Sequence, residues 1–398
     1  MKKLHKVLSL GMIALLSATM AVGCGAQKSA TSSGTSSGSG EIKIGGNLEL
    51  TGGTAMFGQA AQNAINLAFE QINAKGGDLG GKKLVLIAAD NKSDAGESTS
   101  AVTKLVAQDK VVAVIGSMTS SVTLAAVPVV TDNKIPMISP SGTNAKVTMD
   151  PASGVRPYVF RACFIDPFQG QVGANFALNT LKAKTAAVLI DQKSDYSKGL
   201  ADAFVTNFTK GNGQIVGTEQ YVAGSDKDFR SILTRIKAKN PDMVWLPGYY
   251  QEVGLIVKQA RELGMKMPFM GGDGWDDPQL FNIGGAEALN NTFYCDHVAT
   301  DDPGMATFVK DYKAKFNSEP NAMAALGYDA ANLIAKAIED GKSAEPEKIR
   351  AALEGMKGFK GVGGEITIDP KTHNPEKSAV IKENKNGKPT FLTRVAPK

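Results

Sequence analysis

The chain is poor in the residues that most enzymes use for chemistry. Its 398 residues include 3 histidines, and one of them, His5, lies in an N-terminal segment that we expect to be removed. The other two, His297 and His373, stand alone, without an HExxH pair or a Cys/His cluster. No Gly-x-Ser-x-Gly elbow joins a strand to a helix, and no GxxxxGK[ST] loop occurs. These absences argue against an enzyme, and we expect no cofactor and no catalytic residue.

Cysteine and net charge are also low. The chain has 3 cysteines and a formal net charge of +5, which falls to +2 without Lys2, Lys3 and Lys6. No block of Lys and Arg occurs, so the charge gives no reason to expect a nucleic-acid partner. Hydrophobic residues make up 42% and charged residues 21%, which is ordinary for a soluble globular protein. The length suits two cores rather than one.

The N-terminus has the organisation of an export signal. Three lysines precede an apolar run from Val7 to Ala21, which is shorter than the ~20 residues that a membrane span needs. The run ends in Ala21-Val22-Gly23-Cys24, which resembles a bacterial lipobox, although Ala21 stands where leucine is commoner. We expect a signal peptide (1–23), a lipidated Cys24 and a flexible linker (24–40) that holds the protein at the outer side of a membrane. The alternative is ordinary secretion with Cys24 as a passive thiol.

From Glu41 onward, short apolar runs alternate with amphipathic stretches. This alternation predicts parallel strands joined by helical crossovers. The pattern runs from Ile42 to Ile138 and then restarts at Gln169, with further strands up to Met270. We therefore predict an α/β fold with two doubly wound sheets, one in each of two lobes. Three helices in a row, near 303–316, 322–340 and 346–356, have no strands between them and are expected to cover the first lobe.

Ligands of open α/β sheets bind beyond the carboxyl ends of the strands. In lobe 1, two neighbouring strands end in Ser117-Met118-Thr119-Ser120-Ser121 and in Ser139-Pro140-Ser141-Gly142-Thr143. Hydroxyls, free N–H groups and a helix dipole suit an anion such as an α-carboxylate. The alternative for each loop is simple helix capping.

The strand ends of lobe 2 have a different character. They carry Asp191 and Tyr196, then Gly248-Tyr249-Tyr250, then Gly272-Asp273-Gly274-Trp275. A carboxylate with aromatic faces suits an ammonium group. The two lobes together therefore favour a zwitterionic ligand that bridges them.

Two other interpretations of these loops are weaker. The stretch from Thr51 to Gly58 joins a strand to a helix, but its glycine spacing does not match a dinucleotide fingerprint, and Phe57 would take up the space of a pyrophosphate. The acidic stretch 273–277 offers fewer oxygen ligands, at less regular spacing, than Ca²⁺ usually requires. We expect no metal site.

At this point the chain from Glu41 to its end resembles the branched-chain amino-acid (Leu/Ile/Val) binding proteins of ABC importers, which have the type I periplasmic binding protein fold. The resemblance rests on Ile72-Asn73-Ala74-Lys75-Gly76-Gly77, Val114-Ile115-Gly116, Ile135-Pro136-Met137-Ile138-Ser139-Pro140, Gly224-Ser225-Asp226-Lys227-Asp228-Phe229 and Phe269-Met270-Gly271-Gly272-Asp273-Gly274. Together these stretches span nearly the whole mature chain.

The resemblance implies a role for each candidate residue. Ser120 and Thr143, with the backbone at Ser141, would hold the α-carboxylate. Asp273 would take the ammonium, with Tyr196 and Tyr249 beside it, and Phe57 and Trp275 would shape the side-chain pocket. Two positions depart from the family: tyrosine is frequent where Phe57 stands, and glutamate where Asp273 stands. Both changes affect pocket size and leave the branched-chain preference open.

The resemblance also implies three chain crossings between the lobes, near Arg161–Phe164, Tyr294–His297 and Glu365–Ile368. Lobe 1 would comprise 41–161 and 297–365, and lobe 2 would comprise 162–296 and 366–398. Cys163 and Cys295 would lie on neighbouring hinge segments, where either a disulfide or two separate thiols could occur.

The sequence thus predicts a monomeric, lipid-anchored solute-binding protein that delivers an amino acid to the permease subunits of an ABC transporter. Two alternatives stay open. The same lobes could serve a chemosensory or signalling receptor, or the ligand could be an amide, urea-like or aromatic acid compound.

Overall fold

A computed structural model describes residues 40–397. The predicted signal peptide, the lipidated Cys24 and all of the predicted linker except Gly40 lie outside these residues. Within the described part, no helix is both long enough and apolar enough to cross a membrane.

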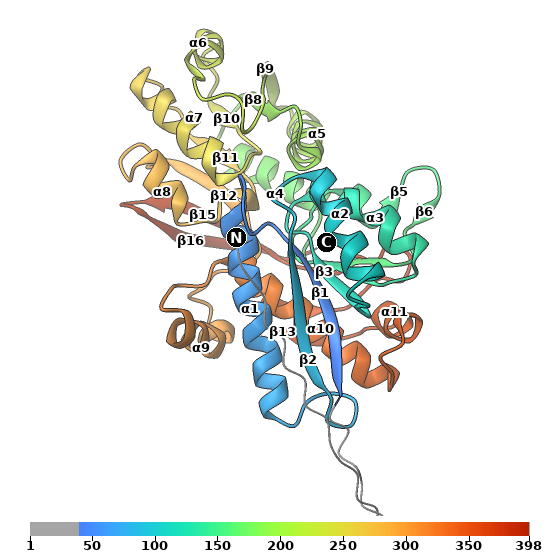
Figure 1. Ribbon diagram of the computed structural model, residues 1–398. Coiled ribbons are helices and arrows are strands. Elements are labelled where there is room, and N and C mark those ends of the chain that lie inside the picture. Colours follow the sequence, from blue (N-terminus) through green and yellow to red (C-terminus); the bar gives the residue numbers. More distant parts are fainter. Residues whose placement is uncertain (1–39, 398) are drawn as a thin grey trace, which may run out of the picture. The chain divides into compact units, whose positions relative to one another are not determined.

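Lobe 1 is built on a five-stranded parallel sheet with the strand order β2-β1-β3-β4-β7. Its strands are β1 (Glu41–Leu48), β2 (Lys83–Asp90), β3 (Ala113–Gly116), β4 (Met137–Ser139) and β7 (Val159–Arg161). The crossovers between the first four are α1 (Ala55–Ala74), α2 (Ala95–Ala107) and α3 (Ser120–Asp132). Figure 1 shows this lobe in blue to teal.

Both faces of this sheet are buried, because successive side chains of a strand point to opposite sides. Val114, Met137 and Val159 pack in one cluster with α2 and α3. Their neighbours Ile115, Ile138 and Phe160 belong to the cluster on the other face, with α1 and α10 (Ala322–Gly341). This two-sided burial explains the continuous apolar runs in the sequence.

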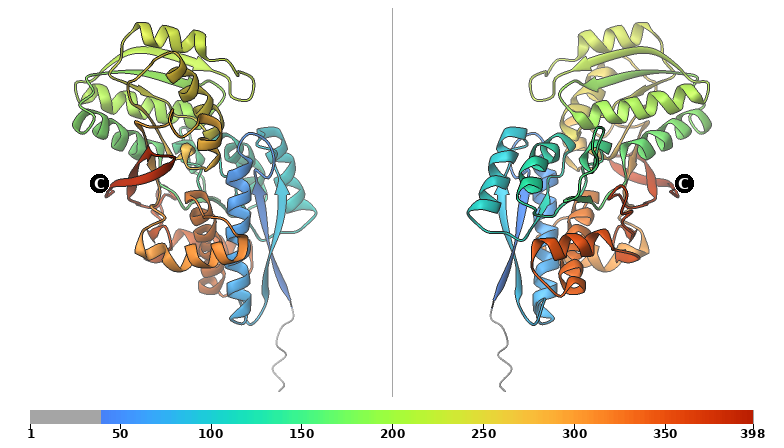
Figure 2. Two further views of the ribbon diagram at one scale, coloured as in Figure 1. Left: turned by 90° about the vertical axis from the view of Figure 1, so that its left-hand side faces the viewer. Right: turned by 90° about the vertical axis from the view of Figure 1, so that its right-hand side faces the viewer.

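Lobe 2 is built on a seven-stranded sheet with the order β16-β15-β12-β11-β10-β8-β9. Its parallel strands are β8 (Thr185–Asp191), β9 (Gln214–Tyr221), β10 (Met243–Trp245), β11 (Phe269–Gly271) and β12 (Thr292–Asp296). The antiparallel strands β15 (Ala379–Lys385) and β16 (Lys388–Val395) extend one edge. Figure 2 shows the two sheets from both sides.

Helices cover both faces of this sheet as well. Ala186 and Val188 pack with α4 (Asp166–Asn179) and α5 (Asp195–Lys210), whereas Ala187 and Leu189 belong to the cluster on the opposite face. That face carries α6 (Arg230–Ala238), α7 (Tyr250–Glu262) and α8 (Gln279–Gly284). The predicted α/β class with two doubly wound sheets is therefore confirmed.

The C-terminal helices return to lobe 1, as expected. They are α9 (Ala306–Phe316), α10 and α11 (Pro346–Glu354), and α10 packs along α1 (Figure 1). At the contact, a methyl group added at Gly327 of α10 would lie 2.9 Å from Ala61 Cα of α1, so the two helices approach closely.

The third crossing lies later than the predicted Glu365–Ile368. Residues 364–366 form β14, which pairs with β13 (Phe359–Gly361) rather than with the lobe 2 sheet. His373 Nδ1 still contacts Val159 O of lobe 1 at 3.0 Å, and Thr148 Oγ1 donates to Asn374 Oδ1 at 2.7 Å. The chain therefore reaches lobe 2 between Asn374 and the start of β15. The hairpin keeps this segment on lobe 1.

Two further features differ from the sequence expectations, and the structure also decides a question about two cysteines that the sequence left open. Helix α4 begins at Asp166, three residues before the predicted start, and a small hairpin, β5 (Met149–Asp150) with β6 (Gly154–Val155), was not predicted. Cys163 and Cys295 are both buried free thiols, so the structure contains no disulfide between them. Burial raises the pKa of the Cys163 thiol to about 12, which keeps it protonated and unreactive near neutral pH.

Candidate functional site

The loop that follows β3 is held by a buried carboxylate. Glu49, just beyond β1, is fully buried and accepts hydrogen bonds from Met118 N and Thr119 N, each at 3.0 Å, and from Thr119 Oγ1 at 2.9 Å. Burial raises the pKa of Glu49, while these donors partly oppose that rise. The chain can pass this close because residue 58 is glycine: a methyl group there would lie 2.1 Å from Glu49 O. The loop that begins α3 is thereby fixed before any ligand arrives.

The second loop of lobe 1 is joined to the first. Asn144 N donates to Ser120 Oγ at 3.1 Å, and Ser141 Oγ donates to Met118 O at 2.7 Å. Arg161, at the end of β7, stabilises the same loop by donating to Gly142 O at 2.7 Å and to Asn144 O at 2.9 Å. Ser120 keeps its hydroxyl hydrogen for another acceptor, whereas Ser141 has used its own. Two of the predicted carboxylate-binding residues, Ser120 and Thr143, thus come from adjacent, interlocked loops.

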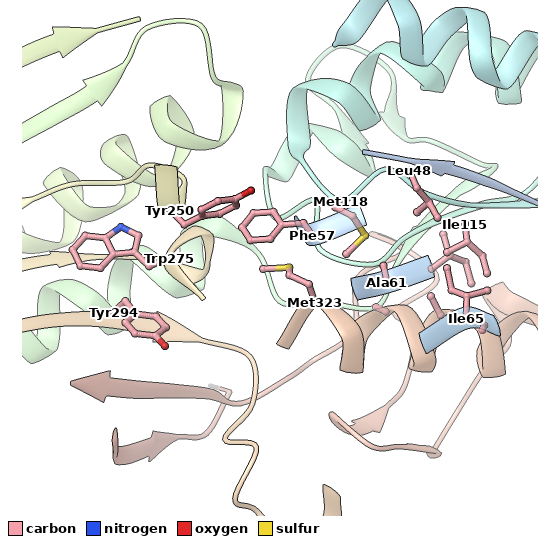
Figure 3. Packing of buried hydrophobic residues seen from close by; sticks show 14 of the residues in the cluster. Leu48, Phe57, Ala61, Ile65, Ile115, Met118, Tyr250, Trp275, Tyr294 and Met323 are labelled. Atoms are coloured by element: carbon pink, nitrogen blue, oxygen red, sulfur yellow. The ribbon is translucent and has the colours of Figure 1, made fainter. Parts of the chain in front are cut away.

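Lobe 2 contributes aromatic rings. Tyr196 and Tyr249 stack with their ring centroids 5.1 Å apart, and Tyr196 Oη accepts a hydrogen bond from Gly274 N at 3.2 Å. Phe57 of lobe 1 meets Tyr249 edge-on at 6.0 Å and Tyr250 at 5.1 Å (Figure 3). Burial raises the pKa of Tyr196 and of Tyr249 well above the usual value, so both keep a neutral hydroxyl that can donate.

Asp273 follows β11 and is 3% exposed. Its two oxygens are each engaged: Gln169 Nε2 donates to Oδ1 at 2.9 Å, and His297 Nε2 lies 3.0 Å from Oδ2. Desolvation lowers the pKa of His297, which is stacked on Phe164 at 3.9 Å between centroids. Asp273 is therefore a carboxylate oriented by two neighbours, close to Tyr196.

A second carboxylate, Asp166, lies in the same region and was not predicted. It is 1% exposed and begins α4, and its N–H donates to Thr143 O at 2.9 Å. Burial raises the pKa of Asp166 well above its usual value, and the nearby Asp273 carboxylate raises it further. The adjacent Thr143 hydroxyl lowers this pKa, yet neither Thr143 Oγ1 nor either Asp166 oxygen makes a well-formed hydrogen bond within residues 40–397.

Hydrogen bonds join the lobes next to these residues. Ser121 Oγ donates to Asp195 Oδ2 and accepts from Asp195 N, both at 2.9 Å. Asn144 Nδ2 donates to Asp195 O at 2.7 Å. We call Ser121, Asn144 and Asp195 the interlobe latch. Each latch residue is the sequence neighbour of a candidate ligand residue: Ser120, Thr143 and Tyr196.

A cavity of about 420 Å³ opens beside this region, lined by both lobes. Lobe 1 supplies Gly53, Thr54, Lys92, Ser93, Asp94, Ala95, Thr119, Ser121 and Val122, and lobe 2 supplies Asp191, Lys193, Ser194, Ala223, Gly224, Tyr249 and Glu252. Asp191 stabilises the lobe 2 side of this cavity, because it accepts hydrogen bonds from Lys193 N and Ala223 N.

Comparison with known proteins places this geometry in a family. The sequence profile described as periplasmic binding protein matches residues 41–388. The chain belongs to the periplasmic binding protein family. Among its relatives, Leu/Ile/Val-binding protein homolog 3 of Brucella melitensis is 32% identical over 82% of this chain and 87% of that protein. The leucine-specific-binding protein of Salmonella typhimurium is 32% identical over 83% and 86%.

Solved structures agree with this assignment. A branched-chain amino acid transporter substrate-binding protein of Streptococcus pneumoniae, in complex with isoleucine, has a TM-score of 0.83 and 38% identity, covering 90% of this chain and 100% of that one. A leucine-binding protein of Thermotoga maritima gives 0.83 and 37%, covering 89% and 99%. A benzoate-bound solute-binding protein of R. palustris, at 24% identity and a TM-score of 0.81 over 90% and 97%, shares the fold. Proteins of this family are extracytoplasmic solute-binding proteins, and this chain is one of them.

Trp275 does not take the place that the family resemblance implied. It is fully buried, donates from Nε1 to Leu246 O at 3.0 Å and stacks near Tyr294 at 6.2 Å (Figure 3). These contacts place the indole in the core of lobe 2, where it supports the loop that carries Asp273. Figure 3 shows Phe57, in contrast, against Tyr250 at the meeting of the lobes.

The acidic stretch 273–277 is also used structurally. Asp276 accepts hydrogen bonds from Ala322 N at 2.7 Å and Tyr294 Oη at 3.0 Å, and it pairs with Lys382 at 3.3 Å. Among the residues that the structure describes, no three His, Cys, Asp or Glu side chains form a group suited to a metal ion.

Sequence reasoning missed Glu49, Asp166, Gln169 and the latch. Asp166 carried a usable signal, since Asp166-Pro167 is a typical helix start. Glu49 had no signal, because its partners Met118 and Thr119 are remote in the sequence and meet it through the pairing of β1 with β3.

Proposed function

We propose that this protein is the lipid-anchored solute-binding component of an ABC importer, and that it captures an amino acid between its lobes for delivery to the permease. The observation that carries the proposal is the meeting of two complementary sets of groups. Lobe 1 presents the hydroxyls of Ser120 and Thr143, and lobe 2 presents Asp273 between Gln169 and His297 with Tyr196 close by.

The α-carboxylate would bind to lobe 1. Ser120 is the first residue of α3, and its hydroxyl hydrogen is not used by its bond from Asn144 N. A helix N-terminus attracts negative charge, and hydroxyl donors strengthen that attraction. Glu49 and Arg161 hold both loops in place, so little ordering entropy would be lost when the carboxylate binds.

The ammonium would bind to lobe 2. An ammonium has three donors and no acceptor, so it needs carboxylate or carbonyl oxygens around it. Asp273 is buried and rigidly oriented, and Tyr196 and Tyr249 provide neighbouring ring surface. Charge-assisted hydrogen bonds to such a carboxylate are about twice as strong as neutral ones.

Closure would couple the two halves of the ligand. When the lobes meet, the interlobe latch forms from residues adjacent to Ser120, Thr143 and Tyr196. A ligand that bridges the lobes binds the closed form better than the open form and shifts the population toward it. The permease would then distinguish the loaded protein by its closed shape.

The side chain of the ligand would meet Phe57, whose ring contacts Tyr249 and Tyr250. An apolar wall of this kind favours a small aliphatic amino acid. Names of relatives support that class: one binds leucine specifically, and one from Pseudomonas aeruginosa binds leucine, isoleucine, valine, threonine and alanine.

A thermal-shift screen of the 20 standard amino acids, with acetamide, urea and benzoate as further compounds, tests the ligand class. Binding stabilises the native state by mass action, so the melting temperature rises with the bound compound alone. We expect leucine, isoleucine or valine to give the largest rise, with a dissociation constant then measured by calorimetry. A response to benzoate, urea or acetamide, with none to amino acids, would overturn the proposed ligand.

Replacement of Cys24 tests the anchor. A Cys24→Ser variant has no thiol to carry a lipid, so we expect it to appear in the soluble extracellular or periplasmic fraction, whereas the native chain stays with membranes. Metabolic labelling with a palmitate analogue gives a second readout. Continued membrane retention of the unlabelled variant would contradict lipid anchoring.

A further inference from the structure

Asp273 is not the best-placed acceptor for a new cation. Each of its oxygens already has a protein partner, Gln169 Nε2 on one side and His297 Nε2 on the other. Asp166 is equally deep, at 1% exposed, and both of its oxygens lack a hydrogen-bond partner in the described chain. A buried carboxylate without a well-formed hydrogen bond is unfavourable, because it has lost water and the adjacent Thr143 hydroxyl replaces little of it.

The position of Asp166 at the start of α4 does not explain why its oxygens lack hydrogen-bond partners. A carboxylate at this place usually accepts from the free N–H groups of the first helical turn. In this protein Phe168 N and Gln169 N both donate to Ile165 O, at 3.0 Å each. The nearest guanidinium, Arg161, gives its hydrogen bonds to Gly142 O, Asn144 O and Thr148 Oγ1. Asp166 therefore serves neither as a helix cap nor as the partner of a hydrogen-bonded ion pair.

Other unused atoms surround the same place. Thr143 Oγ1 and Gln169 Oε1 also lack partners among residues 40–397. Thr143 lies beside Asp166, and Gln169 is one helical turn beyond it and bonded to Asp273. A methyl group at Gly272 would lie 2.9 Å from Gln169 Oε1 and 2.5 Å from Tyr196 Oη, so these two atoms lie near each other beside Gly272. Each unused atom in this set, including both Asp166 oxygens, can accept a hydrogen bond.

A cluster of unused acceptors matches a group that can only donate. An ammonium group carries three N–H donors and one positive charge. The two carboxylates of the site, Asp166 and Asp273, lie close enough that each disfavours the charge of the other, and an ammonium near both would relieve that repulsion. We propose that Asp166 is a direct ligand of the amino-acid ammonium, with Thr143 Oγ1 and Gln169 Oε1 as the neighbouring acceptors. Asp273 then orients Gln169 and shares the charge.

This inference rests on the proposed amino-acid ligand and adds a specificity rule to it. The site would select α-amino acids over α-hydroxy acids of the same side chain, because a hydroxyl leaves Asp166 without its charge partner. The test is therefore a pair of probes, L-isoleucine and (2S,3S)-2-hydroxy-3-methylpentanoate, measured by calorimetry against the native chain and an Asp166→Asn variant.

We expect Asp166→Asn to weaken isoleucine binding on the order of 10- to 100-fold, as for loss of a charged hydrogen bond, and to leave binding of the hydroxy acid within a few-fold. The ratio of the affinities for isoleucine and for the hydroxy acid would therefore fall in the variant. The ligand-free variant should also melt at a higher temperature than the native chain, because the amide N–H₂ can donate to the unused acceptors beside it. A residue that only supports the fold would not raise stability while lowering affinity.

Asp329→Asn is the matched control. Asp329 is also 1% exposed, but it lies on α10, outside the strand-end loops, and accepts from Val362 N at 2.7 Å and Gly363 N at 2.9 Å. This variant should lose stability and keep its preference for isoleucine. Native protein that binds isoleucine, with unchanged affinity in Asp166→Asn, would overturn this inference alone. Native protein that binds neither isoleucine nor any other amino acid would overturn the proposed function and the inference together.

Discussion

The two lobes meet the cleft with different chemistry. Lobe 1 offers neutral hydroxyls on loops that are fixed from behind by the buried charges of Glu49 and Arg161. In lobe 2, Tyr249 lines the cavity between the lobes and stacks on Tyr196, which lies close to the buried carboxylate of Asp273. In the proposed function, the charged residues of lobe 1 hold the binding loops in place, whereas the charged residue of lobe 2 would bind the ligand itself.

This difference indicates a division of labour. A carboxylate is common to all amino acids, so lobe 1 needs only a set of hydrogen-bond donors. Because these donors are held in place before the ligand binds, little ordering entropy would be lost on binding. The ammonium and its surroundings distinguish an amino acid from other small acids, so lobe 2 would decide the class of ligand. Substitutions in lobe 2 should therefore change affinity directly, whereas those behind the lobe 1 loops should change stability first.

The largest effect is expected from lobe 2. Asp273→Ala removes the carboxylate and leaves Gln169 and His297 without their partner, so binding of the amino acid should weaken by about 2 kcal/mol or more. Calorimetry measures the loss, and Asp202→Ala, an exposed acidic position on α5, is the control for net charge. Unchanged affinity in the Asp273 variant would show that Asp273 takes no part in ammonium recognition.

A substitution behind the lobe 1 loop should have a different profile. Glu49→Gln places an amide N–H₂ against donors at Met118 N or Thr119 N, so the free energy of unfolding should fall by about 1–3 kcal/mol. Affinity should fall about tenfold as the loop shifts, which corresponds to ~1.4 kcal/mol. Chemical denaturation and calorimetry separate the two effects, with Glu41→Gln on the exposed side of β1 as control. A large loss of affinity without loss of stability would mean that Glu49 contacts the ligand itself.

The smallest effect is expected at the latch. Ser121→Ala removes both side-chain hydrogen bonds to Asp195, which are partly exposed, so about 1 kcal/mol of closure energy should be lost. The ligand should dissociate roughly fivefold faster, and association should change little. Stopped-flow kinetics measures both rates, with Ser100→Ala on the exposed face of α2 as control. A slower association with unchanged dissociation would contradict a role in holding the lobes together.

Much of the fold could be predicted because its signal is local and repeated. Apolar runs such as Ala186–Ile190 are buried on both faces, and helices of ordinary length separate them, so the alternation indicates parallel sheets directly. The three consecutive helices from α9 to α11 were predicted from the absence of strands between them. The third crossing was misplaced because β14 pairs with β13 on lobe 1, and the residues of a strand do not by themselves show which strand it pairs with.

The site was predictable only in part. Ser120, Thr143 and Asp273 follow strands, and the rule that ligands bind at strand ends is enough to find them. Trp275 follows the same strand as Asp273, yet its indole turns to Leu246 O and into the core. Position after a strand restricts where the backbone lies, whereas the direction of a side chain depends on which cavities and acceptors the rest of the chain provides.

The amino-acid sequence by itself determined the α/β class, the two lobes, the strand-end loops and the scarcity of catalytic side chains. The tertiary structure decided which buried charges stay paired. Glu49 is satisfied by a loop distant in the sequence, the terminal nitrogens of Arg161 donate to the loop at 142–148, and Cys163 and Cys295 remain separate thiols. Asp166 is left with its oxygens unpaired beside Thr143 and Gln169. Hydrogen bonding depends on distances of about 3 Å between atoms, and only the packing of the complete chain sets those distances.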